Sequence, residues 1–387
     1  MRRAILHNEK GSALLISLLL MGMLTLLAVM AVRSSNTDMD LTFNQINGDK
    51  TFYIAEAGAK RAIAELNIDP SWTAGYSNIG FNGGSYTVQI TDSSTNAALI
   101  DTIIITSTGW TINAQSAVEM AVVPRYNNPF KHALFGDDGV ELKNGMRTDS
   151  YNSDSGSYAA TRDTLDGDVG SNATITMHNG SYVGGDVVTS SDSSALDING
   201  GATVTGDVKY DVPEETLDPI PQAEFDMAES NNDNTTGISG SYSYNPSTYA
   251  FQSSGTVTLS DGTYYFSSII LKNSAELIIA PGAEVKIYVT GDIEIKNSGG
   301  VNVGGTPGDL MFLSQGDIVL KNSGELSAIF YSPDGDGDLR NSADFYGSIV
   351  AKTIVVHNSA AFHYDRELGK KRISSIIGYE AVAWREL

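Results

Sequence analysis

The longest apolar stretch of the chain covers residues 12–32 and contains no charged side chain. As a helix rising about 1.5 Å per residue, it is long enough to cross the roughly 30 Å hydrocarbon core of a bilayer. Arg2, Arg3 and Lys10 precede it, and basic residues favour the cytoplasmic side. The pattern predicts a leader at residues 1–11, a transmembrane helix, and an extracytoplasmic remainder.

Two alternatives to this assignment stay open at the level of sequence. One is a secretory signal peptide cut after Ala31, although typical signal cores are only about 7–15 residues long. The other is a plain single-pass anchor that is never cut. The length of the apolar run and the helix-forming residues behind it favour a helix that is retained.

The helix is expected to continue beyond the membrane over residues 33–69, because no proline interrupts it. Apolar positions recur there at steps of three, four or seven, namely at Met39, Phe43, Ile46, Tyr53, Ala57 and Ala64. This spacing places them on one stripe of a helix, and such a stripe needs a partner surface. Asp69 and Pro70 should end the helix, since proline lacks the amide hydrogen and restricts the residue before it.

Short β-prone runs follow the helix at residues 85–90, 103–105 and 117–123, separated by turn residues. They predict a small antiparallel meander within residues 70–125. An antiparallel sheet buries one face, and the upper half of the long helix is the nearest apolar surface. We therefore expect the meander to pack on that half of the helix.

A hexad of the form apolar, any, apolar, basic, Asn, small recurs from residue 140 onward. Its asparagines, one of them in a truncated copy, are Asn144, Asn179, Asn273, Asn297, Asn322, Asn341 and Asn358. A second recurring motif, Gly-Asp followed by Val or Ile, begins at Gly167, Gly185, Gly206, Gly291 and Gly316. Repeats at such intervals indicate a solenoid. We assign them to two groups, residues 126–210 and 235–369.

The expected fold of this body is a right-handed-type parallel β-helix, which makes the whole chain mainly β with one long amino-terminal helix. Alternation places Val285, Ile287 and Val289 on the buried face of a rung and leaves Lys286 and Tyr288 on the wet face. Asparagine tolerates left-handed backbone angles, so the hexad asparagines are predicted corners, and stacked amides are expected to bond between rungs. A β-sandwich is the alternative architecture.

Two further segments frame the repeats. Residues 211–234 contain three prolines and several acidic residues, a composition that resists packing and predicts a linker or crossing. Residues 370–387 include Ile373, Ile376 and Ile377, which are expected to cap the last rung, because an open β-helix end exposes unpaired amides.

Composition excludes some classes of function. The formal net charge is -22, from 24 basic and 46 acidic side chains, which opposes nucleic-acid binding because that affinity depends on neutralising phosphates. The chain has no cysteine, so disulfides and thiolate metal sites are absent. No cofactor is expected.

Candidate chemistry is sparse. His363 and Asp365 are two residues apart and would share one side of a strand, but a base and its orienting acid also need a nucleophile or a substrate pocket. Asp334, Asp336 and Asp338 alternate with glycine like the start of a calcium loop. The later bidentate acid of that loop is missing, so a solvated turn is favoured. No catalytic residue and no metal ligand is assigned.

The amino-terminal pattern resembles the class III signal peptides of the type IV pilin superfamily, with a hydrophilic leader that ends in glycine directly before an apolar helix. Arg33-Ser34-Ser35 and Phe52-Tyr53-Ile54-Ala55-Glu56-Ala57-Gly58-Ala59 resemble the amino-terminal domain of PilX-type minor pilins. The resemblance implies that a prepilin peptidase cuts between Gly11 and Ser12 and methylates the new terminus. The family positions that it implies are Arg33, Phe52, Glu56 and Gly58.

One position departs from the major pilins, which usually carry glutamate at the fifth mature residue. Here that residue is Ile16. A carboxylate inside lipid is costly unless it is paired, so its absence eases insertion and removes a device that sets subunit register. This argues against a bulk filament subunit and favours a minor or priming role.

The repeats, with Ser150-Tyr151 and His363-Tyr364-Asp365, resemble the β-helical region that often follows PilX-type amino termini. The expected function is a non-enzymatic minor pilin-like component of a type IV pilus machine, with its body periplasmic and available for assembly priming or surface contact. Its expected partners are other pilins, pilus assembly proteins, the prepilin peptidase and the lipid bilayer. A tip pseudopilin of type II secretion and an anchored polysaccharide-active enzyme are the alternatives.

Overall fold

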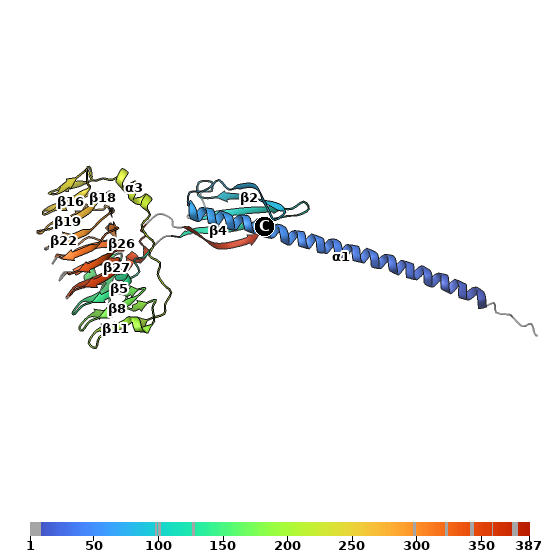
Figure 1. Cartoon of the computed structure of the whole chain (residues 1–387), viewed down its shortest axis with the longest axis horizontal. Helices are drawn as coiled ribbons and strands as arrows, with labels where there is room; N and C mark the ends of the chain where they lie inside the picture. Colours follow the sequence, from blue (N-terminus) through green and yellow to red (C-terminus); the bar gives the residue numbers. More distant parts are fainter. Residues whose placement is uncertain are drawn as a thin grey trace, which may run out of the picture. The chain divides into compact units, whose positions relative to one another are not determined.

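The computed structural model divides the chain into two units (Figure 1). The helix–sheet unit comprises residues 1–125 and 376–387, and the β-helical body comprises residues 126–375. The structure describes residues 9–96, 99, 102–125, 128–296, 299–321, 324–340, 344–357, 359–373 and 378–387.

The first element is a single helix, α1, that spans Glu9–Ile68. Its 60 residues correspond to a length of roughly 90 Å at the usual rise per residue. The helix ends where the sequence predicts, with the amide of Asp69 still donating to the carbonyl of Glu65 at 2.8 Å just before Pro70. The predicted continuity from the apolar run into residues 33–69 is therefore confirmed.

The helix–sheet unit also contains an antiparallel sheet of order β1-β2-β3-β4-β29. Its strands are β1 Tyr76–Phe81, β2 Gly84–Thr91, β3 Ile103–Trp110, β4 Gln115–Arg125 and β29 Gly378–Glu386. The predicted meander corresponds to β2, β3 and β4, whereas β1 and β29 were not predicted.

The carboxyl-terminal strand β29 corrects the expected cap on the body. It pairs antiparallel with β4, from Gly378 opposite Arg125 to Glu386 opposite Val118. Of the isoleucines expected in the cap, Ile373 is buried in an apolar cluster of the body, and Ile376 and Ile377 lie outside the described residues. Residues 378–386 instead complete the sheet of the other unit. As a consequence, the whole body is inserted between two neighbouring strands of one sheet.

The sheet packs on the carboxyl-terminal part of α1 through a buried apolar cluster. Its helix members are Ile54, Ala55, Ala59, Ala62 and Leu66, and its sheet members include Tyr86, Val88, Ile105, Val118 and Val122. Three of the five helix members are alanine, so the sheet approaches the helix closely. The predicted packing of the meander on the upper half of the helix is confirmed.

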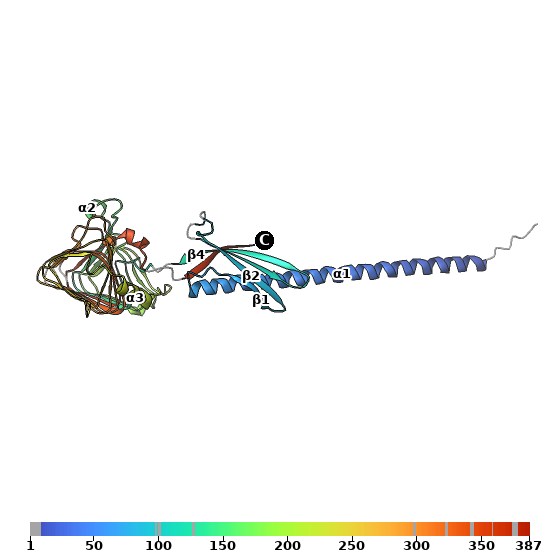
Figure 2. The same ribbon diagram turned by 90° about the horizontal axis from the view of Figure 1, so that it is seen from above.

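The body is a stack of short strands, mostly in parallel register (Figures 1 and 2). The first group comprises β5 Leu134–Leu142, β6 Arg147–Tyr151, β7 Val169–Ser171, β8 Thr174–Met177, β9 Tyr182–Val183, β10 Val187–Thr189, β11 Leu196–Ile198, β12 Thr203–Val204 and β13 Val208–Lys209. A short helix, α2 Tyr158–Thr161, and a helix in the crossing, α3 Gln222–Ser230, lie outside the coil (Figure 2).

The second group follows α3. It comprises β14 Ile238–Gly240, β15 Ser243–Asn245, β16 Ala250–Ser253, β17 Thr256–Leu259, β18 Gly262–Phe266, β19 Ser268–Leu271, β20 Glu276–Ile279, β21 Val285–Val289, β22 Ile293–Lys296, β23 Gly300–Val301, β24 Leu310–Ser314, β25 Ile318–Lys321, β26 Leu326–Leu339, β27 Asp344–Val356 and β28 Ala361–Asp365. Antiparallel pairs, β14 with β17 and β15 with β16, occur near its start.

The two groups form one continuous stack, although a crossing separates them in sequence. β27 pairs in parallel with β5, with Ile349 opposite Leu134, and β28 pairs in parallel with β6. The last rung of the second group therefore lies directly on the first rung of the first group. The predicted parallel β-helix is confirmed, but its rungs are not stacked in sequence order.

The interior of the stack contains one long apolar core. One buried cluster includes Leu134, Val169, Val187, Val257, Ile287, Phe312, Phe330, Ile354 and Phe362, so it continues across the junction of the two groups. Val285, Ile287 and Val289 belong to it, as their alternation predicts. In such a core each rung packs on its two neighbours, and these contacts stabilise a solenoid that has no disulfides.

The outer face of the body is not exposed to solvent at every rung. This corrects the expectation that Tyr288 is exposed. This side chain is only 7% exposed, and its hydroxyl donates to Glu224 Oε2 at 2.9 Å. Phe225 of α3 packs on its ring at a centroid distance of 5.5 Å. The segment at residues 211–234, expected to resist packing, therefore covers part of the body through α3.

The Gly-Asp motif lies at a corner where hydrogen bonds join successive rungs. An aspartate Oδ1 accepts the main-chain N–H of the next aspartate in the stack, in the pairs Asp168–Asp186 (2.6 Å), Asp186–Asp207 (2.7 Å), Asp292–Asp317 (3.0 Å) and Asp317–Asp336 (2.9 Å). The glycine before each aspartate allows this approach. A Cβ on Gly316 would lie 2.4 Å from the carbonyl carbon of Gly291.

Replacing Gly316 by alanine is expected to lower the free energy of unfolding of the body by about 1–3 kcal/mol, as overpacking of a tight site does. Gly200 is the matched control, because a Cβ there meets nothing within 4 Å. Denaturant unfolding followed by circular dichroism measures both variants. Equal effects of the two substitutions would contradict the corner mechanism.

Candidate functional site

The first candidate site is the apolar half of α1, which no other part of the described chain covers. Gly11 and Ser12, the implied processing residues, lie in its first turns. From Ala13 to Val32 every side chain is exposed. Within the described residues α1 is the one helix that is long and apolar enough to cross a membrane. Ile16, in place of the usual glutamate, is 60% exposed.

The four implied family positions lie along α1 in different environments. Arg33 is exposed, and its carbonyl accepts a bond from Thr37. Phe52 is half-buried, and Glu56 pairs with Lys60 at 2.8 Å.

Gly58 has the clearest structural role of the four family positions. It is buried against the sheet, and a Cβ there would lie 2.5 Å from Ser107 Oγ and 2.7 Å from the ring of Tyr86. Only glycine lets the helix approach these strands so closely.

The expected stripe does not bind the sheet. Met39, Phe43, Ile46 and Tyr53 are all about 60% exposed in the single chain. The helix face that does pack was not predicted, because three of its five apolar members are alanines, which give a weak hydrophobic signal. Thr51 is an example, since it is fully buried and its hydroxyl lies 2.9 Å from Ser116 Oγ.

Three of the hexad asparagines fall in the described part of the body. Each sits in a corner turn, in which Met146, Ser181 or Ala275 donates to the basic residue that precedes the asparagine. Asn273 has a positive φ of 55°, whereas Asn144 and Asn179 are followed by glycines of positive φ. No hydrogen bond joins the side chains of these three asparagines to one another. Asn297, Asn322, Asn341 and Asn358 lie outside the described residues.

The acidic triplet is not a solvated turn, because Asp334, Asp336 and Asp338 belong to β26. Asp338 is paired with Arg340 at 2.8 Å and with His357 at 3.0 Å. Asp336 accepts a bond from the Thr353 hydroxyl. Across the described residues, no group of three or more His, Cys, Asp or Glu side chains is placed to hold a metal ion.

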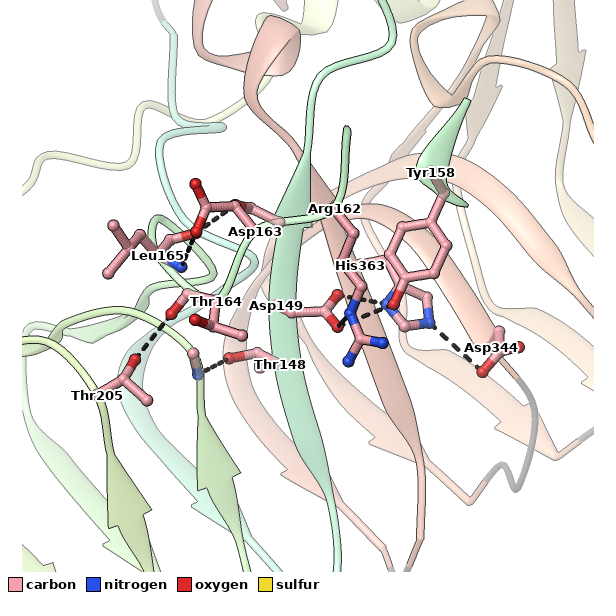
Figure 3. Close-up of polar contacts among 12 residues, drawn as sticks. Thr148, Asp149, Tyr158, Arg162, Asp163, Thr164, Leu165, Thr205, Asp344 and His363 are labelled. Carbon is pink, nitrogen blue, oxygen red and sulfur yellow. Dashed lines mark hydrogen bonds and ion pairs between the residues drawn. The ribbon is translucent and has the colours of Figure 1, made fainter. Parts of the chain in front are cut away.

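His363 is bonded to Asp149 and not to Asp365, which corrects the sequence-based pairing (Figure 3). Its Nδ1 lies 2.5 Å from Asp149 Oδ1, and its Nε2 lies 3.4 Å from Asp344 Oδ1. Asp365 instead accepts the amides of Ser153 and Glu367. Both ring nitrogens of His363 therefore face carboxylates, so this side chain links β28 to β6 and β27.

Asp149 is the centre of this network and is completely buried. Its Oδ2 accepts from the Tyr158 hydroxyl and from Arg162 Nε, both at 2.9 Å (Figure 3). Burial disfavours the charged carboxylate, yet bonds from His363 and Tyr158 and the charge of Arg162 hold the pKa of this carboxyl below its usual range.

A pocket of about 450 Å³ opens beside the network, and we name it the tyrosine pocket. Its lining comprises Tyr151, Ser153, Gly156, Ser157, Tyr158, Ala159, Gly304, Gly305, Thr306, Glu325 and Tyr346. The residues come from β6, the segment around α2, the loop after β23, the position just before β26, and β27. Burial raises the pKa of Tyr346 to about 12, so its phenol is neutral at physiological pH. This site is not apparent from the sequence, because its members are brought together only by the junction of the two repeat groups.

Two family models match the chain. Residues 10–60 match the family described as PilX N-terminal. Residues 200–371 match a domain of unknown function, DUF7305. No curated protein is similar to this chain at a significant level.

Solved structures show distant likeness only. The competence-associated pilin ComZ from Thermus thermophilus matches with 10% identity and a TM-score of 0.29, covering 88% of this chain and 97% of ComZ. An ice binding protein from an Antarctic Biological Consortium matches with 13% identity and a TM-score of 0.37, covering 62% and 91%. The DUF3494 domain of Shewanella frigidimarina ice-binding protein_1 matches with 12% identity and a TM-score of 0.35, covering 62% and 97%. Scores this low carry no argument about function.

The match at residues 10–60 covers the apolar run, Arg33, and the first part of the segment that packs on the sheet. The amino-terminal resemblance is thereby confirmed. Residues 10–60 of this chain are similar to the PilX N-terminal family, and a β-helical body follows them in the sequence.

Proposed function

We propose that this protein is a minor pilin of a type IV pilus machine that displays a β-helical body for assembly priming or surface contact. In this proposal α1 is inserted in the bacterial inner membrane with its amino end cytoplasmic and the body periplasmic. A prepilin peptidase removes residues 1–11, and other pilins and pilus assembly proteins contact the helix.

The proposal is supported by a difference in burial between the two parts of α1. One face of the helix from Thr51 to Leu66 is buried by the sheet, whereas the large apolar residues before it are uncovered. Residues 13–32 suit lipid. Met39, Phe43 and Ile46 continue the exposed apolar surface beyond that span and suit a neighbouring helix in an assembly.

The minor role is supported by Ile16. A carboxylate at this position would need a partner inside the bilayer, and its absence removes one means of fixing subunit register. A subunit that lacks this carboxylate suits a position that occurs only once in each filament. Its recovery from purified pili, as opposed to type II secretion fibres, would separate the minor pilin from the tip pseudopilin.

Processing is the direct test of the proposal. Mass spectrometry of the mature protein should find a methylated Ser12 at the amino terminus. Replacing Gly11 by valine should leave the leader attached and keep the protein out of the filament.

Gly22 is the matched control for this test, since it lies in the same helix and a Cβ there meets nothing within 4 Å. Its replacement by valine should leave processing intact. An intact Met1 in the native protein, or a start at Val32, would overturn the proposal.

A further inference from the structure

We propose that one end of the β-helical body binds the same end of a second copy of this chain. The surface consists of β11, β12 and β13, residues 196–209, and we name it the open rung. The proposal goes beyond pilus assembly, because every residue that it uses lies in the body. A chain that never enters a filament would still be expected to pair, so the two proposals fail separately.

The strands of the open rung are paired along one edge. β11 pairs with β8, β12 with β9 and β13 with β10, all in parallel, at the lower end of the stack in Figure 1. The N–H groups of Thr203 and Thr205 donate to the rung above, to the carbonyls of Ser181 and Val183. Because N–H groups alternate in direction along a strand, that of Val204 points away from the stack.

The other edge of the open rung is free in the part of the chain that the structure describes. No described strand pairs along it, as the partners of β11, β12 and β13 show. Such an edge presents a row of main-chain donors and acceptors, which is a template for another strand.

The apolar core is uncovered at the open rung. Val208 of β13 is 43% exposed, whereas its register partner Val187 in the rung above is fully buried. Ile198 of β11 is only partly buried, whereas its partner Met177 is fully buried. The core therefore meets water at this end of the single chain, as it does in a solenoid whose terminal repeat has no cap.

The opposite end of the stack is covered by the chain itself. There β15 lies on β16 and β14 lies on β17, both in antiparallel register. The side-chain amide of Asn234 bonds to both main-chain groups of Tyr265 on β18. Phe251 and Val257, in the strands beneath this cover, are buried. The two ends thus differ, and the open rung is the one that suits a partner.

A second copy of the same end matches the open rung. It offers three strands in the same arrangement, each with a free edge beside an apolar core. When a two-fold axis relates two such ends, the chain runs round the two rungs in opposite directions, so facing strands pair antiparallel. A contact of this kind uses the same patch on both copies and closes after two.

The charges of the open rung select one arrangement of the pair. Asp197 is the exposed residue in the middle of β11, and Lys209 ends β13 with 46% of its side chain exposed. A two-fold axis through β12 places β11 of each copy opposite β13 of the other, so Asp197 and Lys209 meet twice. An axis through β11 or β13 places like charges opposite each other, which is unfavourable.

The acid of this pair is available for a second chain. Lys209 is also paired within its own chain, with Asp186 and with Asp207. Asp197 takes part in none of the ion pairs among the described residues, and it is exposed. Pairing through the open rung would therefore give this carboxylate an opposite charge.

Sedimentation velocity of the full chain in lipid nanodiscs, at one copy per disc, tests the proposal. The discs keep the membrane helices apart, so pairing through the bodies joins two discs. Joined discs are expected to form with a dissociation constant on the order of 10 μM, as for a small interface. Single discs at every concentration up to about 100 μM would overturn the proposal. That outcome includes the case in which a different protein covers the open rung.

A charge within the apolar part of the open rung should prevent pairing. Val208→Asp is expected to weaken association at least tenfold, because the carboxylate would be buried without a partner. Val208 is exposed in the single chain, so this variant should keep the native circular dichroism spectrum. Val303→Asp is the matched control, since Val303 is 52% exposed and lies outside the open rung. Equal association of the native and Val208→Asp chains would contradict the proposed surface.

Charge reversal tests the arrangement of the pair. Asp197→Lys should weaken association about fivefold, since it sets two lysines opposite each other at two places in the pair. Glu229→Lys makes the same change in net charge on α3, at an exposed position outside the open rung, and should leave association unchanged. Association of Asp197→Lys that equals or exceeds that of the native chain would contradict the axis through β12.

Discussion

The β-helical body is expected to lose about 3–5 kcal/mol of unfolding free energy when Asp149 is replaced by alanine, as happens when one partner of a buried ion pair is removed. The carboxylate is fully buried and accepts bonds from His363, Tyr158 and Arg162. Without it, a buried imidazole and a phenol lose their partner. Denaturant unfolding of the full chain, followed by circular dichroism, measures the change.

Two controls make this result specific. Asp344 lies 3.4 Å from the other nitrogen of His363 with 59% of its side chain exposed, so Asp344→Ala should change stability by less than about 1 kcal/mol. Trp72, Trp110 and Trp384, the three tryptophans of the chain, all lie in the helix–sheet unit. Their fluorescence should report an unchanged transition. A loss spread equally over both units would contradict the prediction.

The pH dependence has a definite sign. The pKa of Asp149 is lower in the folded chain than in the unfolded chain, where an aspartate titrates near 3.9. Its contribution to stability is therefore complete above roughly pH 5 and is lost as the pH falls through the folded pKa. The stability difference between the native chain and Asp149→Asn should shrink below about pH 4. A difference that grows in acid would contradict the assignment.

Truncation after residue 373 is expected to abolish the cooperative unfolding of the helix–sheet unit. It removes β29, which pairs with β4 along most of its length. It also removes Tyr379, whose N–H donates to Asn67 at 2.6 Å and whose hydroxyl donates to the carbonyl of Pro70 at 3.2 Å. The fluorescence of Trp72 and Trp110 should then change without a sharp transition.

A point variant tests the same role in the full-length chain. Tyr379→Ala should destabilise the helix–sheet unit by about 3 kcal/mol, as loss of a buried aromatic ring does. Trp384 on the same strand is 60% exposed, so Trp384→Ala should have an effect of about 0.5 kcal/mol or less. The circular dichroism transition of the body should be unchanged in both. A truncated chain that keeps its fluorescence transition would show that β29 is dispensable.

Much of the fold followed from local pattern. The helix and its end at Asp69–Pro70 depend on residues close in sequence, and so do the alternating strands of each rung. The location of β29 does not, because a strand of ordinary composition carries no signal for a partner more than 250 residues away. The predicted exposure of Tyr288 was wrong for a related reason. Alternation predicts which side of a strand a residue takes, but not whether another segment covers that side.

The candidate sites divide in the same way. The implied processing residues and family positions lie in short local motifs, so a resemblance was enough to propose them. His363 and Asp149 are 214 residues apart and meet only because the last rung of the second group stacks on the first rung of the first group. Sequence proximity suggested Asp365 instead, whose carboxylate serves the amides of a local turn. The tyrosine pocket depends on the same junction.

Insertion of the body between β4 and β29 has a mechanical consequence. The body is joined to the rest of the molecule by two covalent connections, which leave the sheet at the register partners Arg125 and Gly378. A tensile load on the body is therefore divided between two polypeptide segments. Cleavage of either connection by a protease would leave the body tethered through the other.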